Sequence, residues 1–424
     1  ICLETLFYML SGMVDTLMLS AVGDYAVGAV GTANSYIGIF IIMFSIISSG
    51  MVSVMTQNIG AGRPGVAYQA RQLGLLFNAV AGVLMAVFLF SGAGAILRMV
   101  GIADALYEPA LIYLKIVGGG CILNAVIPIF SSYLRAFGYT KQPLYATIVG
   151  NIANFVMNAV FLFVLHKGVA GVATATVISK ILNLCIVLYF SHKLISAKNS
   201  TERIANKTVL GQIVKVGLPS ACETALYNVA MMLVIRFLNQ MDAEGLNVTA
   251  RSYTATISNF SYCVGAALAQ ANAIMTGWHI GAGELEECDR GTKRAAFVGV
   301  CVAVCMETAI VLGSGFIMPL FTDNPEMTAL VRKLLAIDIV LEIGRVTNLV
   351  FGQALKTSGD AVFPAVIAAV FMFVFAVGGT WLFGISMGLM AVGAYIGLAS
   401  DECVRAVGMV WRWKTGKWRT KKLV

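Results

Sequence analysis

Long stretches with almost no charged side chain recur along the whole chain, and they constrain the fold more than any other feature. Only 12% of the 424 residues are charged, whereas 59% are hydrophobic. Ordinary soluble domains carry about 25% charged residues. Backbone in lipid must satisfy its own hydrogen bonds, so each stretch of about 20 apolar residues predicts a transmembrane helix. We therefore expect an all-α polytopic membrane protein.

Twelve spans are expected from these stretches. They cover residues 1–20, 26–58, 68–97, 106–136, 142–165, 169–194, 212–239, 247–279, 291–320, 327–357, 362–384 and 388–412. The chain begins at Ile1, inside an apolar run. We therefore expect a first helix that lacks its N-terminal residues, and no signal peptide.

A polar segment divides the spans into two groups of six. Residues 196–207 (SAKNSTERIANK) combine charged side chains with no apolar periodicity, which is typical of a linker. The expected organisation is a six-helix lobe at 1–194, a cytoplasmic linker at 195–211, a second six-helix lobe at 212–412 and a basic cytoplasmic tail at 413–424.

Two short motifs recur at one distance along the chain. Ile-Gly-Ala-Gly occurs at 59–62 and 280–283, and Leu-Arg/Lys-x-x-Gly-x-x-x-x-Pro occurs at 134–143 and 355–364. Both repeats are offset by 221 residues (280 − 59 and 355 − 134). Each half has an even number of spans, so the halves share one orientation in the membrane. A pseudo-twofold axis along the membrane normal is expected to relate the two lobes.

Lys and Arg are divided unevenly between the two sides of the expected membrane. The odd-numbered loops carry only Arg98, Lys167, Arg332 and Lys333, whereas the even-numbered loops and the tail carry most of the others. Loops rich in Lys and Arg stay in the cytoplasm, so both termini are expected there, in a cell (inner) membrane. The tail alternates Trp with cations from Trp411 to Arg419, which predicts an anchor at the lipid headgroups.

The net charge of +8 follows from this cytoplasmic bias, so no nucleic-acid partner is expected. Nine cysteines and three histidines are scattered without a C-x-x-C pair, so neither a metal centre nor another cofactor is predicted. The expected partners are membrane lipids and small organic molecules, and we expect a monomer.

Asp15 is the most informative single residue. It lies in the first apolar span, nine residues before Asp24, where we expect that helix to end. At 1.5 Å per residue the carboxylate would lie roughly 13 Å from the helix end. A charge in hydrocarbon costs about 2.5–3.5 kcal/mol on insertion scales, so Asp15 is expected to face the protein interior and serve an ion or proton pathway. A structural carboxylate bonded across a helix interface is the alternative.

The ordered set of motifs resembles the multidrug and toxic compound extrusion (MATE) family. The set comprises Val14-Asp15-Thr16, both Ile-Gly-Ala-Gly motifs, residues 133–138 (YLRAFG) and residues 168–171 (GVAG) with Thr176. Asp401-Glu402 with Arg405 resembles bacterial members in particular. The resemblance covers essentially the whole chain. It implies two six-helix bundles around a central cavity, with protons or sodium ions entering while an amphipathic, often cationic, molecule leaves.

Polar residues of the fifth and sixth spans match the cation site of that family. Asn151, Asn154 and Asn158 share one helical face, either as a polar pocket beside Asp15 or as a link between helices. Asn154 matches a family Asn, whereas Asn158 stands where many members have Asp. Thr176 matches a family threonine, or it bonds only its own backbone. One carboxylate instead of two favours proton coupling at Asp15, with sodium as the open alternative.

The second half has intramembrane charges of its own: Glu223, Glu307, Asp338, Glu342 and Arg345. Asp338 and Glu342 share a helical face, and Glu342 can pair with Arg345 three residues on. Unpaired carboxylates would suit cationic substrates, so Glu223, Glu342 and Asp338 are candidates for substrate binding or a second proton site. Glu307 could equally be structural. The second sodium site of the family is not carried over, because Arg345 replaces an acidic residue there.

The sequence therefore predicts a secondary active antiporter that exports amphipathic, cationic organic compounds by alternating access between two lobes. The runner-up is a flippase for lipid-linked oligosaccharides from the same wider superfamily. A flippase would need a cationic cavity, whereas the intramembrane charges other than Arg345 are mostly acidic. An intramembrane enzyme is a third class, with little support because His166 and His192 fall near loop edges; no catalytic residue is assigned.

Overall fold

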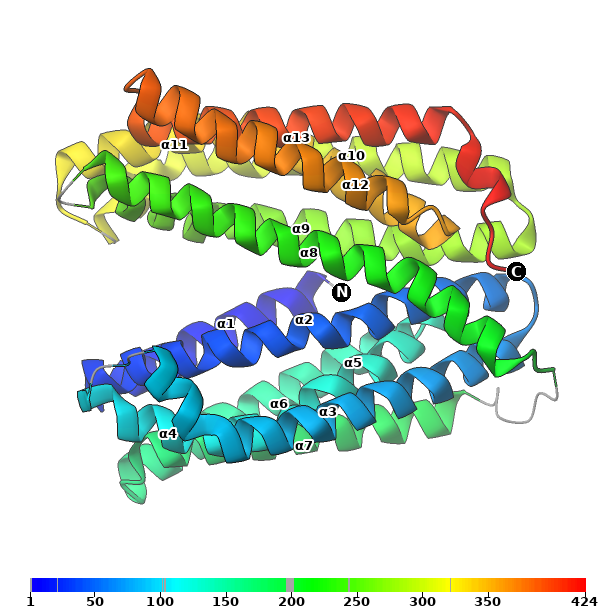
Figure 1. Cartoon of the computed structure of the whole chain (residues 1–424), viewed down its shortest axis with the longest axis horizontal. Helices are drawn as coiled ribbons and strands as arrows, with labels where there is room; N and C mark the ends of the chain where they lie inside the picture. The colour runs from blue at the N-terminus through cyan, green and yellow to red at the C-terminus, as the bar shows by residue number, and fades with distance from the viewer. Residues whose placement is uncertain are drawn as a thin grey trace. The chain divides into compact units, whose positions relative to one another are not determined.

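The computed structural model describes residues 2–20, 22–100, 102, 104–195, 202–242, 245–320 and 322–424. Every regular element in this part of the chain is a helix (Figure 1). The α-helices are α1 (Cys2–Ser20), α2 (Asp24–Gly60), α3 (Pro64–Val100), α4 (Asp104–Gly119), α5 (Cys121–Ala136), α6 (Lys141–Ala159), α7 (Gly168–Leu194), α8 (Asn206–Met241), α9 (Leu246–Ala282), α10 (Leu285–Ile317), α11 (Pro325–Ser358), α12 (Val362–Phe371) and α13 (Met390–Lys414).

Each expected span coincides with one α-helix or with a run of consecutive helical segments. The pair α4 and α5 is bent by 41°, α6 continues into the π-helix η1 (Val160–Val164), and α12 continues into η4 (Met372–Val377) and η5 (Thr380–Ser386). By length and composition, eight helices among the described residues could cross a membrane, or nine with the bent pair. α9, α11 and α13 are not among these helices, because their polar and charged side chains make them less apolar. The all-α prediction is confirmed.

The chain divides into two compact units, unit 1 (Leu3–Gly217) and unit 2 (Leu218–Val424), and the boundary lies inside α8. Residues 206–211, which we predicted as linker, form the first turns of α8. The predicted linker residues 196–201 lie outside the described residues. Gly217 and Gly50 let α8 and α2 cross closely within unit 1, because a Cβ on either glycine would collide with a carbonyl of the other helix.

The sequence repeat is also a repeat of loop geometry. Gly62 and Gly283 have φ of 73° and 80°, and Gly138 and Gly359 have φ of 85° and 97°. These left-handed conformations favour glycine. At each repeated position the backbone N–H of the residue after the glycine donates to a carbonyl five residues earlier: 63 to 58, 284 to 279, 139 to 134 and 360 to 355. The repeated motifs are therefore helix-ending turns of the Schellman kind.

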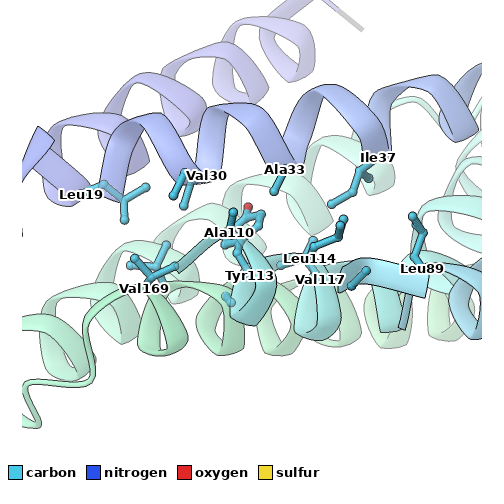
Figure 2. Packing of buried hydrophobic residues seen from close by; sticks show 14 of the residues in the cluster. Leu19, Val30, Ala33, Ile37, Leu89, Ala110, Tyr113, Leu114, Val117 and Val169 are labelled. Carbon is cyan, nitrogen blue, oxygen red and sulfur yellow. The ribbon is translucent and has the colours of Figure 1, made fainter. Parts of the chain in front are cut away.

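Unit 1 has an apolar core that joins α1, α2, α3, α4 and α7 (Figure 2). Figure 2 shows Leu19 and Ile37 on one side and Leu114 and Val117 on the other. Because lipid tails are as apolar as these side chains, close packing rather than loss of water holds such helices together. Gly118 illustrates the closeness, since a Cβ there would lie 2.9 Å from Cβ of Leu89.

The C-terminal tail packs into unit 2. Trp413 and Trp418 are each 1% exposed and stack with ring centroids 4.2 Å apart. Nε1 of Trp413 donates to the Asp289 carboxylate at 2.7 Å, and Nε1 of Trp418 donates to the carbonyl of Trp413 at 3.1 Å. The predicted headgroup anchor is therefore wrong for these two indoles, because they serve the protein core. Trp411, at 59% exposure, is the indole that remains open.

A second close crossing fixes the register of α11 against α13 in unit 2. A Cβ on Gly344 would lie 2.7 Å from the backbone nitrogen of Cys403, and real Cβ atoms do not approach backbone so closely. Gly352, two turns further along α11, has only the Asn348 side chain nearby, at 3.8 Å from its ideal Cβ.

We expect Gly344→Ala to destabilise unit 2 by about 1–3 kcal/mol, because the backbones of α11 and α13 must separate. Gly352→Ala is the matched control on the same helix. It should be neutral or stabilise by up to about 1 kcal/mol, since alanine favours helix. Thermal unfolding of the purified protein in detergent measures both. Equal melting temperatures for the two variants would contradict the close crossing.

Candidate functional site

Asp15 lies in the last third of α1, and its side chain is partly exposed within unit 1. α1 ends at Ser20, as the expected span 1–20 predicted, whereas Asp24, from which we had measured the depth of Asp15, already begins α2. Five residues separate Asp15 from the true helix end, which is roughly 7–8 Å along the axis. The turn at Gly23, with φ of 145°, explains the difference.

The polar face of α6 holds α1 in place. Nδ2 of Asn158 donates to Oδ1 of Asp15 at 2.7 Å and to Oδ1 of Asn154 at 3.2 Å. About two turns from Asn158 towards the start of α6, Nδ2 of Asn151 donates to the carbonyl of Phe7 in α1 at 2.8 Å. Of the three stacked amides, Asn158 therefore binds the carboxylate, Asn154 accepts from Asn158, and Asn151 links α6 to α1. Asn158 is fully buried, and Asn154 is 5% exposed.

α7 contributes Thr176 and Lys180, one turn apart. Oγ1 of Thr176 donates to the carbonyl of Val172 at 2.9 Å, the backbone bond that a lone membrane threonine often makes. Nζ of Lys180 donates to Oδ1 of Asn124 in α5 at 2.8 Å. The ammonium of Lys180 also interacts electrostatically with the carboxylate of Asp15. This lysine is the functional candidate that the sequence analysis missed.

A cavity of about 740 Å³ within unit 1 is lined by most of these groups, although the buried Asn158 lies behind its wall. Its apolar wall includes Ile37, Tyr113 and Val117 of the core shown in Figure 2. Glu4 and Arg135, which pair at 2.5 Å, also line it. The other polar lining residues include Ser11, Asp15, Asn34, Asn124, Ser131, Asn151, Asn154, Thr176, Ser179, Lys180 and Asn183.

Unit 2 holds a second polar cluster between α11 and α13. Arg345 contacts Glu342 on its own helix, as the spacing predicted, and Nε of Arg345 lies 3.6 Å from Oε1 of Glu402. Arg405 lies 2.9 Å from Glu402 and 2.7 Å from Asp401. Two guanidinium groups thus share three carboxylates, which leaves the chain of ion pairs with excess negative charge.

Two further carboxylates adjoin that cluster. Asp338 is 2% exposed and lines a cavity of about 310 Å³ together with Arg251, Arg345 and Glu402. Glu307 is fully buried in α10, and neither of its oxygens accepts a hydrogen bond from the described residues. Asp338 and Glu342 are therefore brought together, as expected from their shared face.

Glu223 lies apart from them, in an ion pair of its own. Its Oε2 is 2.7 Å from Nζ of Lys356, and the two side chains are 21% and 13% exposed. Lys356 lies in the last turn of α11. A paired Glu223 has less charge to offer a substrate than the sequence alone indicated.

A model of the MatE family matches residues 1–160 and 219–382.

The chain belongs to this family.

The MATE assignment agrees with similar proteins that match nearly end to end. The uncharacterized transporter YisQ of Bacillus subtilis is 32% identical, with 99% of this chain and 93% of that protein covered. The probable multidrug resistance protein NorM of Thermotoga maritima is 20% identical, with 99% and 91% covered. A crystal structure of MATE in the straight conformation superposes with a TM-score of 0.88 at 20% identity, with 99% and 94% covered. The polytopic two-lobe fold of a membrane transporter is thus confirmed.

The structure adds two cations to the mostly acidic intramembrane charges of this MATE protein. We had described its intramembrane charges as mostly acidic outside Arg345, yet Lys180 and Arg251 both line cavities. Both lie among apolar and small residues in the sequence. A lone lysine in the middle of an apolar span was the available signal, because such a charge needs a partner.

We expect Glu223→Gln to lower the stability of this MATE protein by roughly 1–3 kcal/mol, because it leaves the Lys356 ammonium, only 13% exposed, without its partner. The double variant Glu223→Gln with Lys356→Met should recover most of the loss. Melting temperatures in detergent supply the comparison.

The matched control is Glu287→Gln, which breaks the exposed Glu287–Arg290 pair, whose side chains are 55% and 74% exposed. Exposed pairs contribute about 0–1 kcal/mol, so little change is expected there. A Glu223→Gln variant as stable as this control would show that the Lys356 pair does not support the fold.

Proposed function

We propose that this protein is a secondary active antiporter that exports amphipathic organic compounds bearing a cationic group in exchange for protons. Membership of the MATE family supports export as the reaction class. The printed name of the Thermotoga maritima relative, a probable multidrug resistance protein, supports organic compounds as the cargo. Alternating access between the two units is the transport mechanism that we propose with it.

The observation that carries the proposal is the place of Asp15. Its carboxylate belongs to the wall of a cavity of about 740 Å³ and is held by Nδ2 of Asn158 at 2.7 Å. A carboxylate in this setting can bind either a cationic substrate or the coupling ion, but not both at full strength. Competition for a single charge is a direct way to couple inward ion movement to outward substrate movement.

Three features favour a proton over a sodium ion at Asp15. Sodium is a hard cation that prefers several oxygen ligands with negative charge, and the neighbour of Asp15 is the neutral Asn158. The ammonium of Lys180 adds repulsion to any metal cation there. Oδ1 of Asn158 is buried and accepts no hydrogen bond from the described residues, so it can accept one from a protonated Asp15.

Protonation would also change what holds α1. The charged carboxylate accepts a hydrogen bond from Nδ2 of Asn158, whereas the neutral acid can donate a hydrogen bond and loses its attraction to Lys180. α1 could then repack against α6, and such a change between two packings is what alternating access requires.

We propose that the transporter lies in the cell (inner) membrane with both termini in the cytoplasm. We propose a monomer that needs lipids but neither nucleic acid nor a cofactor.

The two cations that line the unit 1 cavity do not favour the flippase alternative. Lys180 interacts with Asp15, and Arg135 pairs with Glu4. Each cation of this cavity thus has a carboxylate nearby, so the cavity lacks the net positive charge that a phosphate-linked sugar would need. We therefore propose the exporter.

The test is export from vesicles that contain the purified protein and rhodamine 123, a fluorescent organic cation. We expect an imposed pH gradient to drive export, and a sodium gradient at constant pH to drive none. Asp15→Asn should reduce the proton-driven rate at least tenfold, because an amide cannot take up the coupling proton at neutral pH. The exposed Asp104→Asn is the matched control and should transport normally.

Export driven by sodium alone would replace the proton with sodium in this proposal. Normal gradient-driven export by Asp15→Asn would remove Asp15 from the coupling step. No export by the wild type under any gradient would reject the proposed function itself.

A further inference from the structure

Lys180 is the charged group that the coupling scheme does not itself require. A single carboxylate is enough to exchange a proton for a cation, yet an ammonium lines the same cavity. A buried charge costs free energy unless something balances it. An ammonium in the middle of α7 therefore needs either a ligand or a partner within the protein.

The protein satisfies this ammonium incompletely. Its one hydrogen bond to a described residue goes to Oδ1 of Asn124, at 2.8 Å. Among the described residues no carboxylate lies within the 4.0 Å of an ion pair with Lys180. A lysine ammonium has three N–H donors, so two remain to be used. Nδ2 of Asn124 is also buried, without an acceptor among the described residues.

The cavity therefore has one wall with positive charge and N–H donors and another wall with negative charge. Lys180 and Asn124, from α7 and α5, provide positive charge and N–H groups. Asp15, from α1, provides negative charge and is held in place by Asn158 of α6. The ammonium of Lys180 and the carboxylate of Asp15 attract each other without forming an ion pair, so an electric field crosses the cavity from one wall to the other.

We propose that the unit 1 cavity selects zwitterionic amphiphiles, with Lys180 as the residue that binds their anionic group. A carboxylate of the ligand binds Nζ of Lys180 and the Asn124 amide, while the cationic group of the same ligand binds Asp15. Ile37, Val117 and the ring of Tyr113 supply an apolar wall for the remainder of the molecule. This inference rests on the proposed function and narrows its substrate class.

Charge balance distinguishes a zwitterion from a simple cation. A ligand with both charges satisfies both walls and leaves the total charge of the cavity unchanged. A cation alone satisfies Asp15 but brings a second positive charge close to Lys180 and leaves the free N–H donors without an acceptor. Unpaired polar groups in a binding site are a strong basis for rejecting an analogue that lacks the matching group.

Two fluorescent dyes that differ by one ester test the selectivity directly. Rhodamine 110 carries a free carboxylate and a cationic ring system, and rhodamine 123 is its methyl ester and a simple cation. Binding to the purified protein in detergent is measured by fluorescence anisotropy at pH 7.5. We expect rhodamine 110 to bind the wild type about tenfold more tightly, as befits one hydrogen-bonded charge pair.

Variants assign that preference to Lys180. Lys180→Gln should reduce the preference to about twofold or less while rhodamine 123 still binds, and Lys180→Arg should retain it. Asn124→Asp places a carboxylate against the ammonium with the lysine present, and should also abolish the preference. The exposed Lys167→Gln, outside the cavity, is the matched control and should behave as wild type.

Equal binding of the two dyes by the wild type overturns the inference, as does a preference that survives both Lys180→Gln and Asn124→Asp. The vesicle assay separates this failure from the failure of the proposed function. If rhodamine 123 is exported without any preference for the zwitterion, only the substrate class is wrong. If neither dye binds and neither is exported, the exporter proposal and the inference fall together.

Discussion

Burial of charge in an apolar environment is the constraint on which the rest of this structure depends. Each helix must place its few charged side chains where a neighbouring helix offers a hydrogen-bond partner or an opposite charge. This requirement fixes the rotation of each helix about its own axis. The amide of Asn158 on Asp15 sets the face that α1 presents to α6. In unit 2, the contact of Arg345 with Glu402 sets the rotation of α11 against α13 in the same way. Close glycine crossings, as at Gly344, then allow the contact.

The two units meet this constraint differently. Unit 1 uses few charges, separated by amides and set around a large cavity. Unit 2 uses a dense chain of ion pairs with more carboxylates than cations and a smaller cavity. A dense network of mutual pairs is costly to rearrange, because each broken pair exposes another buried charge. A single carboxylate held by a neutral amide can change its partner with less disturbance, which suits a coupling site.

The sequence was sufficient for the features that depend on local pattern. Apolar stretches located the helices, and the 221-residue offset located turns that share a left-handed glycine, such as Gly138 and Gly359. The alignment of Asn154 and Asn158 on one face followed from helical spacing, as did the pair of Glu342 with Arg345. Partners across helices could not be derived, because they depend on rotations that no local pattern encodes. Lys180 with Asn124 and Glu223 with Lys356 belong to that class.

The buried tail has a practical meaning for anyone who handles this protein. Leu423 is 4% exposed, and the carbonyl of Lys421 lies directly against Gly359, where any larger residue would displace it. The segment around Leu423 is therefore part of the folded body of unit 2. An affinity tag or fluorescent reporter joined directly after Val424 would disturb the packing of Lys421 and Leu423 against Gly359. A flexible spacer would spare that packing and keep the purified material representative of the native transporter.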